Sequence, residues 1–138
     1  MKIDERCHCG AITYEAEIDP GRVTLCHCTD CQTLSGSPYR AVVMTDPGSF
    51  HLLTGTPTIY LKTGTSGAKR EQSFCPICGA PIYSSGVGAG PKFYTIRLGS
   101  IRQRAALAPK MQIWMRSALP WAADLVQVPK METQTEVR

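Results

Sequence analysis

The sequence predicts an all-β protein, a single domain of short antiparallel strands that carries two metal sites. Three observations support this prediction. No long stretch keeps a helical period, β-branched or alternating segments are separated by turn residues, and the cysteines gather in three tight clusters. A chain of 138 residues is also long enough to bury a core of its own.

The strand candidates follow one another along the whole chain. Alternating or β-branched patterns occur at Ala11–Ile18, Tyr39–Met44, Thr58–Lys62, Lys92–Leu98 and Gln112–Met115, and His51 lies in a further apolar segment that reads as a strand. Turn and loop chemistry separates these segments at Asp19-Pro20-Gly21, Asp46-Pro47-Gly48, Thr63-Gly64-Thr65 and Gly86-Val87-Gly88-Ala89-Gly90.

The sequence predicts one short helix and one domain. Residues Cys28–Leu34 can form one helical turn. No repeat or linker divides the chain, so we expect one zinc-binding domain over residues 1–128 and a polar C-terminal tail over residues 129–138.

Composition limits the cellular context and the partners. No apolar run reaches the length of a membrane helix, and the first residues, Met1 to Arg6, lack the apolar stretch of a secretory signal. A cytoplasmic protein with reduced thiols is therefore expected. The formal net charge is +4, and seven thiolates with two zinc(II) ions would lower it by three, to about +1. A nucleic-acid partner is not indicated, and no feature predicts a particular oligomeric state.

The cysteines carry the main chemical signal. There are seven, an odd number that cannot pair off completely as disulfides. Spacings this short let neighbouring thiolates converge on one tetrahedral zinc ion. The clusters are C-H-C at Cys7 and Cys9, C-H-C-T-D-C at Cys26, Cys28 and Cys31, and C-P-I-C at Cys75 and Cys78.

The spacing also suggests how the cysteines divide. Cys75 and Cys78 form a zinc knuckle, in which Pro76 fixes one φ angle and Gly79 tolerates a positive one. Cys7 and Cys9, followed by Gly10, supply the two further ligands of a closed site. Three cysteines then remain for an open site of the kind that catalytic zinc uses, Cys26, Cys28 and Cys31. Spacing alone also allows a second grouping, Cys26 and Cys28 with Cys75 and Cys78.

Other polar residues have weaker claims to a role. His27 is a candidate proton carrier or ligand, because histidine titrates near neutrality, whereas His8 and His51 are expected to be ordinary surface or core histidines. Several basic residues can offset thiolate charge or hold an anion: Arg40, Lys69, Arg70, Lys92, Arg97, Arg102 and Arg104. Among them Arg40, close after the second cluster, is the predicted substrate-binding residue, because arginine grips carboxylates bidentately.

The order of motifs resembles a known family. C-x-C-G-x-x-x-Y-E, C-H-C-x-x-C, G-S-P-Y-R, S-F-C-P-I-C-G-A-P-I and L-P-W follow one another between about Cys7 and Pro129. This pattern resembles the glutathione-dependent formaldehyde-activating enzymes, which include centromere protein V.

The resemblance implies a β-tent fold with a structural zinc on Cys7, Cys9, Cys75 and Cys78 and a catalytic zinc on Cys26, Cys28 and Cys31. It also implies a carbon–sulfur lyase that joins glutathione to formaldehyde. The chain departs from the family at two places. Arg102-Gln103-Arg104 replaces two acids of an S-L-D-D-P motif, and Gln112 stands where many relatives carry a histidine.

The chemistry of the open site favours a sulfur ligand. Three thiolates on zinc(II) leave a net charge of −1, which suits the binding of a fourth thiol as thiolate better than the activation of water. We therefore expect an enzyme that acts on a thiol or thiol adduct, with glutathione as the candidate. Two other functions remain open: a non-catalytic, zinc-stabilised binding module for a protein or nucleic acid, and a thiol-redox protein.

Overall fold

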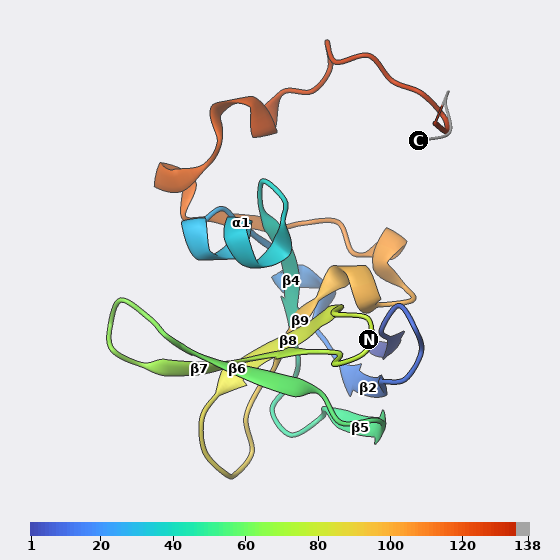
Figure 1. Cartoon of the computed structure of the whole chain (residues 1–138), viewed down its shortest axis with the longest axis vertical. Helices are drawn as coiled ribbons and strands as arrows, with labels where there is room; N and C mark the ends of the chain where they lie inside the picture. The colour runs from blue at the N-terminus through green and yellow to red at the C-terminus, as the bar shows by residue number, and fades with distance from the viewer. Residues whose placement is uncertain (135–138) are drawn as a thin grey trace.

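The computed structural model describes residues 1–134, and its regular structure is mostly β-strands with one short α-helix (Figure 1). The predicted all-β class is confirmed. The helix is α1 (Thr29–Ser35). The strands are β1 (Lys2–Arg6), β2 (Thr13–Glu17), β3 (Thr24–Cys26), β4 (Arg40–Met44), β5 (His51–Thr54), β6 (Thr58–Thr63), β7 (Lys69–Phe74), β8 (Pro81–Gly86), β9 (Thr95–Arg97) and β10 (Met111–Ile113). Short 3₁₀ turns lie at η1 (Pro20–Arg22), η2 (Leu98–Ser100), η3 (Arg104–Ala106), η4 (Met115–Ser117) and η5 (Pro120–Ala123).

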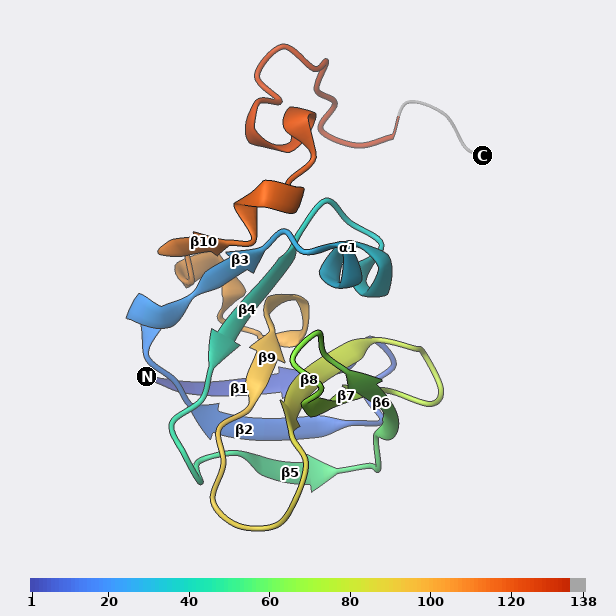
Figure 2. The same cartoon turned by 90° about the vertical axis from the view of Figure 1, so that its left-hand side faces the viewer.

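Two sheets form the body of the molecule. One has three strands in the order β1-β2-β5, and the other has seven in the order β10-β3-β4-β9-β8-β7-β6 (Figure 2). Neighbouring strands are antiparallel except β10, which pairs with β3 in parallel. The pairing is thus antiparallel, as predicted, except at this edge. The long connection after β9 returns the chain to the outer side of β3 in the same direction, as parallel pairing requires.

The predicted strands lie where strands occur in the structure, but several of their ends differ. A strand overlaps every predicted segment, although β10 shares only two residues with Gln112–Met115. The segment Lys92–Leu98 shortens to β9 because its first residues close the loop after β8. Lys92 Nζ donates there to the carbonyl of Gly86 at 2.9 Å. Strands β1, β3, β7 and β8 were not predicted. The sequences of β1 and β7, KIDER and KREQSF, are rich in charge, and backbone pairing with their neighbours makes them strands.

The hydrophobic core lies between the two sheets. Tyr14 of β2 faces inward from the small sheet, while Val43 and Ile96, directly opposite each other on β4 and β9, face it from the large sheet. The core comprises Ile3, Cys7, Ile12, Tyr14, Ala16, Ile18, Val23, Val43, Cys75, Ile82, Tyr83, Ile96, Ile101 and Leu107.

The other face of the large sheet is polar. Arg40 lies opposite Cys26, and Arg97 lies opposite Val42, two residues further along β4. Because side chains on a strand alternate between faces, Arg40 and Arg97 are on the same side of the sheet and away from Val43 and Ile96. We call this surface the polar face; it carries Cys26, Arg40, Arg70, Gln72, Ser84 and Arg97.

Beyond β10 the chain leaves the sheets. The 3₁₀ turns η4 and η5 and the segment after them extend away from the strands at the end where α1 lies (Figures 1 and 2). Residues 135–138 of the predicted tail lie outside the described residues, and the boundary after residue 128 stays a prediction. Among residues 1–134 no helix is long and apolar enough to cross a membrane.

Candidate metal centres and the arginine-lined cavities

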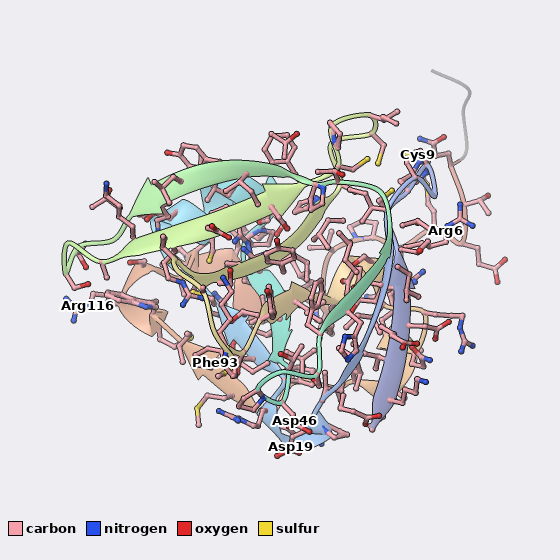
Figure 3. All side chains as sticks on the ribbon, turned by 90° about the horizontal axis from the view of Figure 1, so that it is seen from below. Arg6, Cys9, Asp19, Asp46, Phe93 and Arg116 are labelled. Atoms are coloured by element: carbon pink, nitrogen blue, oxygen red, sulfur yellow. The ribbon has the colours of Figure 1, made fainter. Side chains whose placement is uncertain are left out.

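Four cysteines from two distant parts of the chain meet at one point. The sulfur atoms of Cys7, Cys9, Cys75 and Cys78 all lie within 4.8 Å of one another. The first two follow β1 of the small sheet, and the last two lie between β7 and β8 of the large sheet. This cluster, which we call the four-cysteine cluster, therefore joins the two sheets. Cys9 lies at the edge of the molecule, close to Arg6 (Figure 3).

Both halves of the four-cysteine cluster combine a glycine of positive φ with a backbone amide that donates to a sulfur. Gly10 and Gly79 follow the two cysteine pairs with φ angles of 82° and 75°, the positive values expected for Gly79 from the sequence. The amide of Ile12 donates to Cys7 Sγ at 3.3 Å, and the amide of Ile77 donates to Cys75 Sγ at 3.4 Å. Each turn thus aims a backbone amide at a sulfur, which favours the thiolate.

The sulfur spacing fits a tetrahedral ion. Cys9 Sγ lies 3.6 Å from Cys7 Sγ and 3.7 Å from Cys75 Sγ. Four sulfurs at about 2.3 Å from one zinc ion would lie roughly 3.8 Å apart. The donor set and its spacing therefore suit zinc with four protein ligands.

The second cluster is local to one segment. The sulfurs of Cys26, Cys28 and Cys31 lie within 4.8 Å of one another. Cys26 ends β3, and Cys28 is the N-cap of α1, where its sulfur accepts a hydrogen bond from the amide of Cys31 at 3.3 Å. The strand end and the first helical turn thus bring three thiols together. We call this the three-cysteine cluster. The alternative grouping of Cys26 and Cys28 with Cys75 and Cys78 does not occur.

Hydrogen bonds within the three-cysteine cluster change its acidity. They lower the pKa of the Cys26 thiol to about 5, chiefly through the side chain of Cys31, and burial opposes this effect. The charge of Arg40 lowers the pKa of Cys26 further. The pKa of the Cys31 thiol shifts in the opposite direction: its hydrogen bond with Cys26 and its burial both raise it.

Within residues 1–134 no histidine or carboxylate joins the three-cysteine cluster as a fourth ligand. His27, the candidate from the sequence, is buried, and its Nε2 lies 2.9 Å from Gln112 Oε1. Its ring packs edge-on against Tyr39. Gln112, the second departure from the family pattern, thus fixes the orientation of His27. His8 and His51 are exposed, as expected.

Arg40 is buried and lies opposite Cys26 of the three-cysteine cluster. Arg97 is also buried, and its side chain meets that of Arg40 at Gln72. Burial lowers the pKa of Arg97 to about 9, with a further contribution from the charge of Arg40. The sequence could not separate Arg97 from the other basic residues, because its partner Gln72 is 25 residues away along the chain.

Two cavities adjoin these arginines. The larger, about 850 Å³, opens between the small sheet and the start of β4, and the smaller, about 330 Å³, lies over β6 and β7. Arg40, Arg97 and Pro81 line both. The three cysteines are not part of either lining, although Leu34, one turn after Cys31 on α1, lines the smaller cavity.

A buried carboxyl group also faces the larger cavity. Burial raises the pKa of Glu5 to about 9, while the hydroxyl of Ser100 lowers it in part by donating to Glu5 Oε2 at 2.8 Å. Ser100 in turn lies 3.0 Å from the Tyr14 hydroxyl. This network adds a carboxyl group and two hydroxyl groups to the wall that also carries Arg40 and Arg97.

The replacement of two family acids has a local explanation. Arg102 Nη2 lies 2.8 Å from Asp4 Oδ1, and Gln103 Nε2 donates to the same oxygen at 2.6 Å. Both residues thus hold a carboxylate on β1. Asp4 and Arg102 line the larger cavity, and these hydrogen bonds are exposed, so the exchange of the two acids changes a surface contact.

Comparisons with known proteins agree with these features. A family model described as glutathione-dependent formaldehyde-activating enzyme matches residues 2–117. No curated protein matches the chain. A crystal structure of a Rhodobacter sphaeroides protein, 17% identical, superposes with a TM-score of 0.60 over 79% of this chain and 98% of that one. That likeness shows a shared fold.

Proposed function

Because the chain belongs to the glutathione-dependent formaldehyde-activating enzyme family, we propose that it is a zinc-dependent enzyme acting on the carbon–sulfur bond of a thiol adduct. The observation that carries this proposal is the three-cysteine cluster, which has no fourth protein ligand among residues 1–134. Glutathione with formaldehyde or another aldehyde is the proposed substrate pair. Residues 1–128 would form the zinc-binding domain and residues 129–138 a polar tail.

The two clusters have different parts in the proposal. Cys7, Cys9, Cys75 and Cys78 would hold a structural zinc, because four protein ligands close its coordination. Cys26, Cys28 and Cys31 would hold a catalytic zinc. That ion would supply a fourth position at which a thiol binds as its thiolate.

The proposed reaction is an addition of a thiol to a carbonyl group, so it needs no oxidant or reductant. In the forward direction a carbon–sulfur bond forms between the thiol sulfur and the aldehyde carbon, and the thiol proton ends on the carbonyl oxygen. In reverse the same bond breaks and the aldehyde is released. The protein's own residues would orient the thiol substrate, with Arg40 holding an anionic group. The free state of all seven cysteines supports a reducing, cytoplasmic location.

The test is a rate measurement on the zinc-loaded protein. Exchange of ¹³C-labelled formaldehyde between its free and glutathione-bound forms can be followed by NMR at equilibrium. Wild type should accelerate exchange above the spontaneous rate, and Cys28→Ser should not. Equal exchange with wild type, with Cys28→Ser and without protein would overturn the proposal for this pair, and the same assay can then be run with other aldehydes and thiols.

A non-catalytic binding module is the second candidate. The specific observation in its favour is the set of exposed apolar side chains beyond the start of β10, namely Met111, Ile113, Trp114, Met115, Trp121, Leu125, Val126, Val128 and Met131. A module of this kind would need no exchangeable position at its second zinc. Replacing zinc with cobalt(II) separates the two candidates, since sulfur-to-cobalt absorption should increase on addition of a thiol only for the enzyme.

A further inference from the structure

Two arginines are buried on the polar face without a carboxylate partner. Arg40 is 6% exposed and Arg97 is 8% exposed. Neither forms an ion pair with an acidic residue in the described part of the chain. A buried charge is costly unless it is paired and hydrogen-bonded. The two guanidinium groups therefore indicate a partner that the protein itself does not provide.

Gln72 holds the two guanidinium groups in a fixed relation. Its Oε1 accepts from Arg97 Nη2 at 2.5 Å and from Arg40 Nη1 at 3.2 Å. The Nε atoms of both arginines are buried, and neither has a hydrogen-bond partner within residues 1–134. Within residues 1–134 most N–H donors of both guanidinium groups are thus left without a protein acceptor, beside a shared anchor. Planar groups with free donors in this arrangement suit the two oxygens of a carboxylate.

Space for a ligand is present on both sides of these arginines. Arg40 and Arg97 line the cavity of about 850 Å³ and the cavity of about 330 Å³. The smaller cavity also includes Gln72, with Leu34 and Phe74 as apolar walls. Arg40 lies directly opposite Cys26, and cross-strand neighbours of this kind have Cβ atoms about 5 Å apart. A ligand at the arginines would therefore lie next to the three-cysteine cluster.

Thiolate charge alone does not balance the arginines. Arg40, Arg70 and Arg97 place three positive charges on the polar face, and within residues 1–134 the side chain of Arg70 donates to the hydroxyl of Ser84 and to no carboxylate. Three thiolates with one zinc(II) ion carry −1, and a bound substrate thiolate makes this −2. A positive excess remains that one carboxylate would neutralise.

We propose that Arg97, Gln72 and Arg40 form a binding site for a carboxylate of the substrate, so that the enzyme selects thiols that carry a carboxylate. This specificity site rests on the proposed function, because it assumes that the thiol of the same molecule binds at Cys26, Cys28 and Cys31. Arg97 and Gln72 are its new members. Gln72 positions the two arginines and leaves their remaining donors to the ligand.

The test compares small ligands that differ in one group. The zinc-loaded protein is titrated calorimetrically with 3-mercaptopropionate, with 2-mercaptoethanol, which lacks the carboxylate, and with 3-hydroxypropionate, which lacks the thiol. Wild type should bind 3-mercaptopropionate about 10- to 100-fold more tightly than 2-mercaptoethanol, the range expected for hydrogen bonds to a charged group. Equal affinities for the two thiols would overturn the carboxylate site and would leave the arginines as counter-charges for the cluster.

Gln72→Glu is the decisive variant. It keeps the size of the side chain and places a carboxylate of the protein against both arginines, where it competes with that of the ligand. The preference for 3-mercaptopropionate over 2-mercaptoethanol should fall to near onefold, and this ratio cancels any effect of the added charge on thiol binding itself. Gln127→Glu adds the same charge at an exposed position and should leave the preference unchanged.

A second variant separates a specific site from a general field. Arg97→Lys keeps the charge but removes the planar fork, so most of the preference should be lost. Full retention of the preference in both Arg97→Lys and Gln72→Glu would overturn the proposal. If Gln72→Glu does not fold, as judged by circular dichroism, Arg97→Lys decides by itself.

The ligand series also keeps this inference distinct from the proposed function. If the thiol site is wrong and the carboxylate site is right, 3-hydroxypropionate will bind as tightly as 3-mercaptopropionate, and Gln72→Glu will weaken both. If the thiol site is right and the carboxylate site is wrong, both thiols will bind equally and Cys28→Ser will weaken both.

Discussion

Cys75 and Cys28 are the same side chain in two different surroundings. Cys75 is fully buried in the core, and its cluster connects two sheets. Cys28 is partly exposed and caps a helix of seven residues. The same substitution at the two positions should therefore have different consequences.

Cys75→Ser should unfold the protein, and Cys28→Ser should not. A structural zinc contributes folding free energy outright. The free energy lost with it should exceed the whole free energy of unfolding, which is about 5–15 kcal/mol for a typical protein. Serine is a good N-cap, so Cys28→Ser should keep α1 and change stability by no more than about 2 kcal/mol while abolishing thiol binding. Thermal denaturation with zinc analysis checks both. Equal loss of fold in the two variants would mean that the second site is structural as well.

The contact of Asp4 with Arg102 makes a pH-dependent prediction. Hydrogen bonds from Arg102 and Gln103 hold the pKa of Asp4 below its ordinary value of 3.8. Because the folded-state pKa is lowered, the stability from this contact is present above the ordinary pKa and is lost as the pH falls through the folded-state pKa. In Arg102→Gln the pKa of Asp4 should rise toward 3.8, as measured by carbon NMR of the carboxyl group. Arg116→Gln, at an arginine that stacks on Trp114, is the control and should leave this pKa unchanged.

At the scale of elements, the turn between β5 and β6 holds the chain against the loop after Cys9. Gly55 has a φ angle of +80°, and a Cβ at this position would meet Ala11 O at 2.4 Å and Ile12 Cγ1 at 2.9 Å. The backbone of this turn thus approaches the segment that leaves the four-cysteine cluster. A side chain at Gly55 therefore does not fit unless the backbone at Gly55 or at Ala11 moves.

Gly55→Ala should lower the free energy of unfolding by about 1–3 kcal/mol, because both the positive φ and the contact with the backbone are unfavourable for alanine. Denaturant titration gives this value. Gly48→Ala is the matched control, since Gly48 has a φ angle of +75° with no atom within 4 Å of the added Cβ. A loss no larger at Gly55 than at Gly48 would show that the turn can move away from Ala11.

At the scale of the whole molecule, the two clusters differ in what they connect. The four-cysteine cluster joins the small sheet to the large one, across a sequence separation of 66 residues between Cys9 and Cys75. The three-cysteine cluster lies within one segment of six residues, from Cys26 to Cys31. Loss of the first should separate the sheets, whereas loss of the second should disturb only the start of α1.

If both clusters hold zinc as proposed, acidification of the zinc-loaded protein should remove the two ions in two steps. Protons compete with the metal for sulfur, so occupancy falls as the pH falls. The ion with three protein ligands should leave first, at the higher pH, with the fold retained. The ion with four should leave at lower pH together with the near-ultraviolet circular dichroism of the core. A zinc indicator recorded in parallel with that signal checks the order, and release of both ions in a single unfolding step would contradict it.

Local sequence patterns predict many of the strands but not which strands pair with each other. The segments around Thr58–Lys62 and Gln112–Met115 were recognised as strands because β-branched or apolar residues are adjacent in sequence. Strands β1 and β7 were missed because their residues are mostly charged, and their backbone hydrogen bonds depend on partners elsewhere. The strand at β10 is predicted from its apolar residues, but its parallel pairing with β3 depends on where the chain returns after β9, which no local pattern shows.

Sequence patterns alone predict an all-β chain with seven thiols in three clusters, and a division of these thiols into four and three that the sulfur positions match. Short spacing makes such features local. Which arginines lie beside the three-cysteine cluster depends on how distant strands pair. Arg40, Gln72 and Arg97 come from β4, β7 and β9, and strand order and register bring them together on one face. Pairing between distant strands is a property of the whole chain, and no local pattern encodes it.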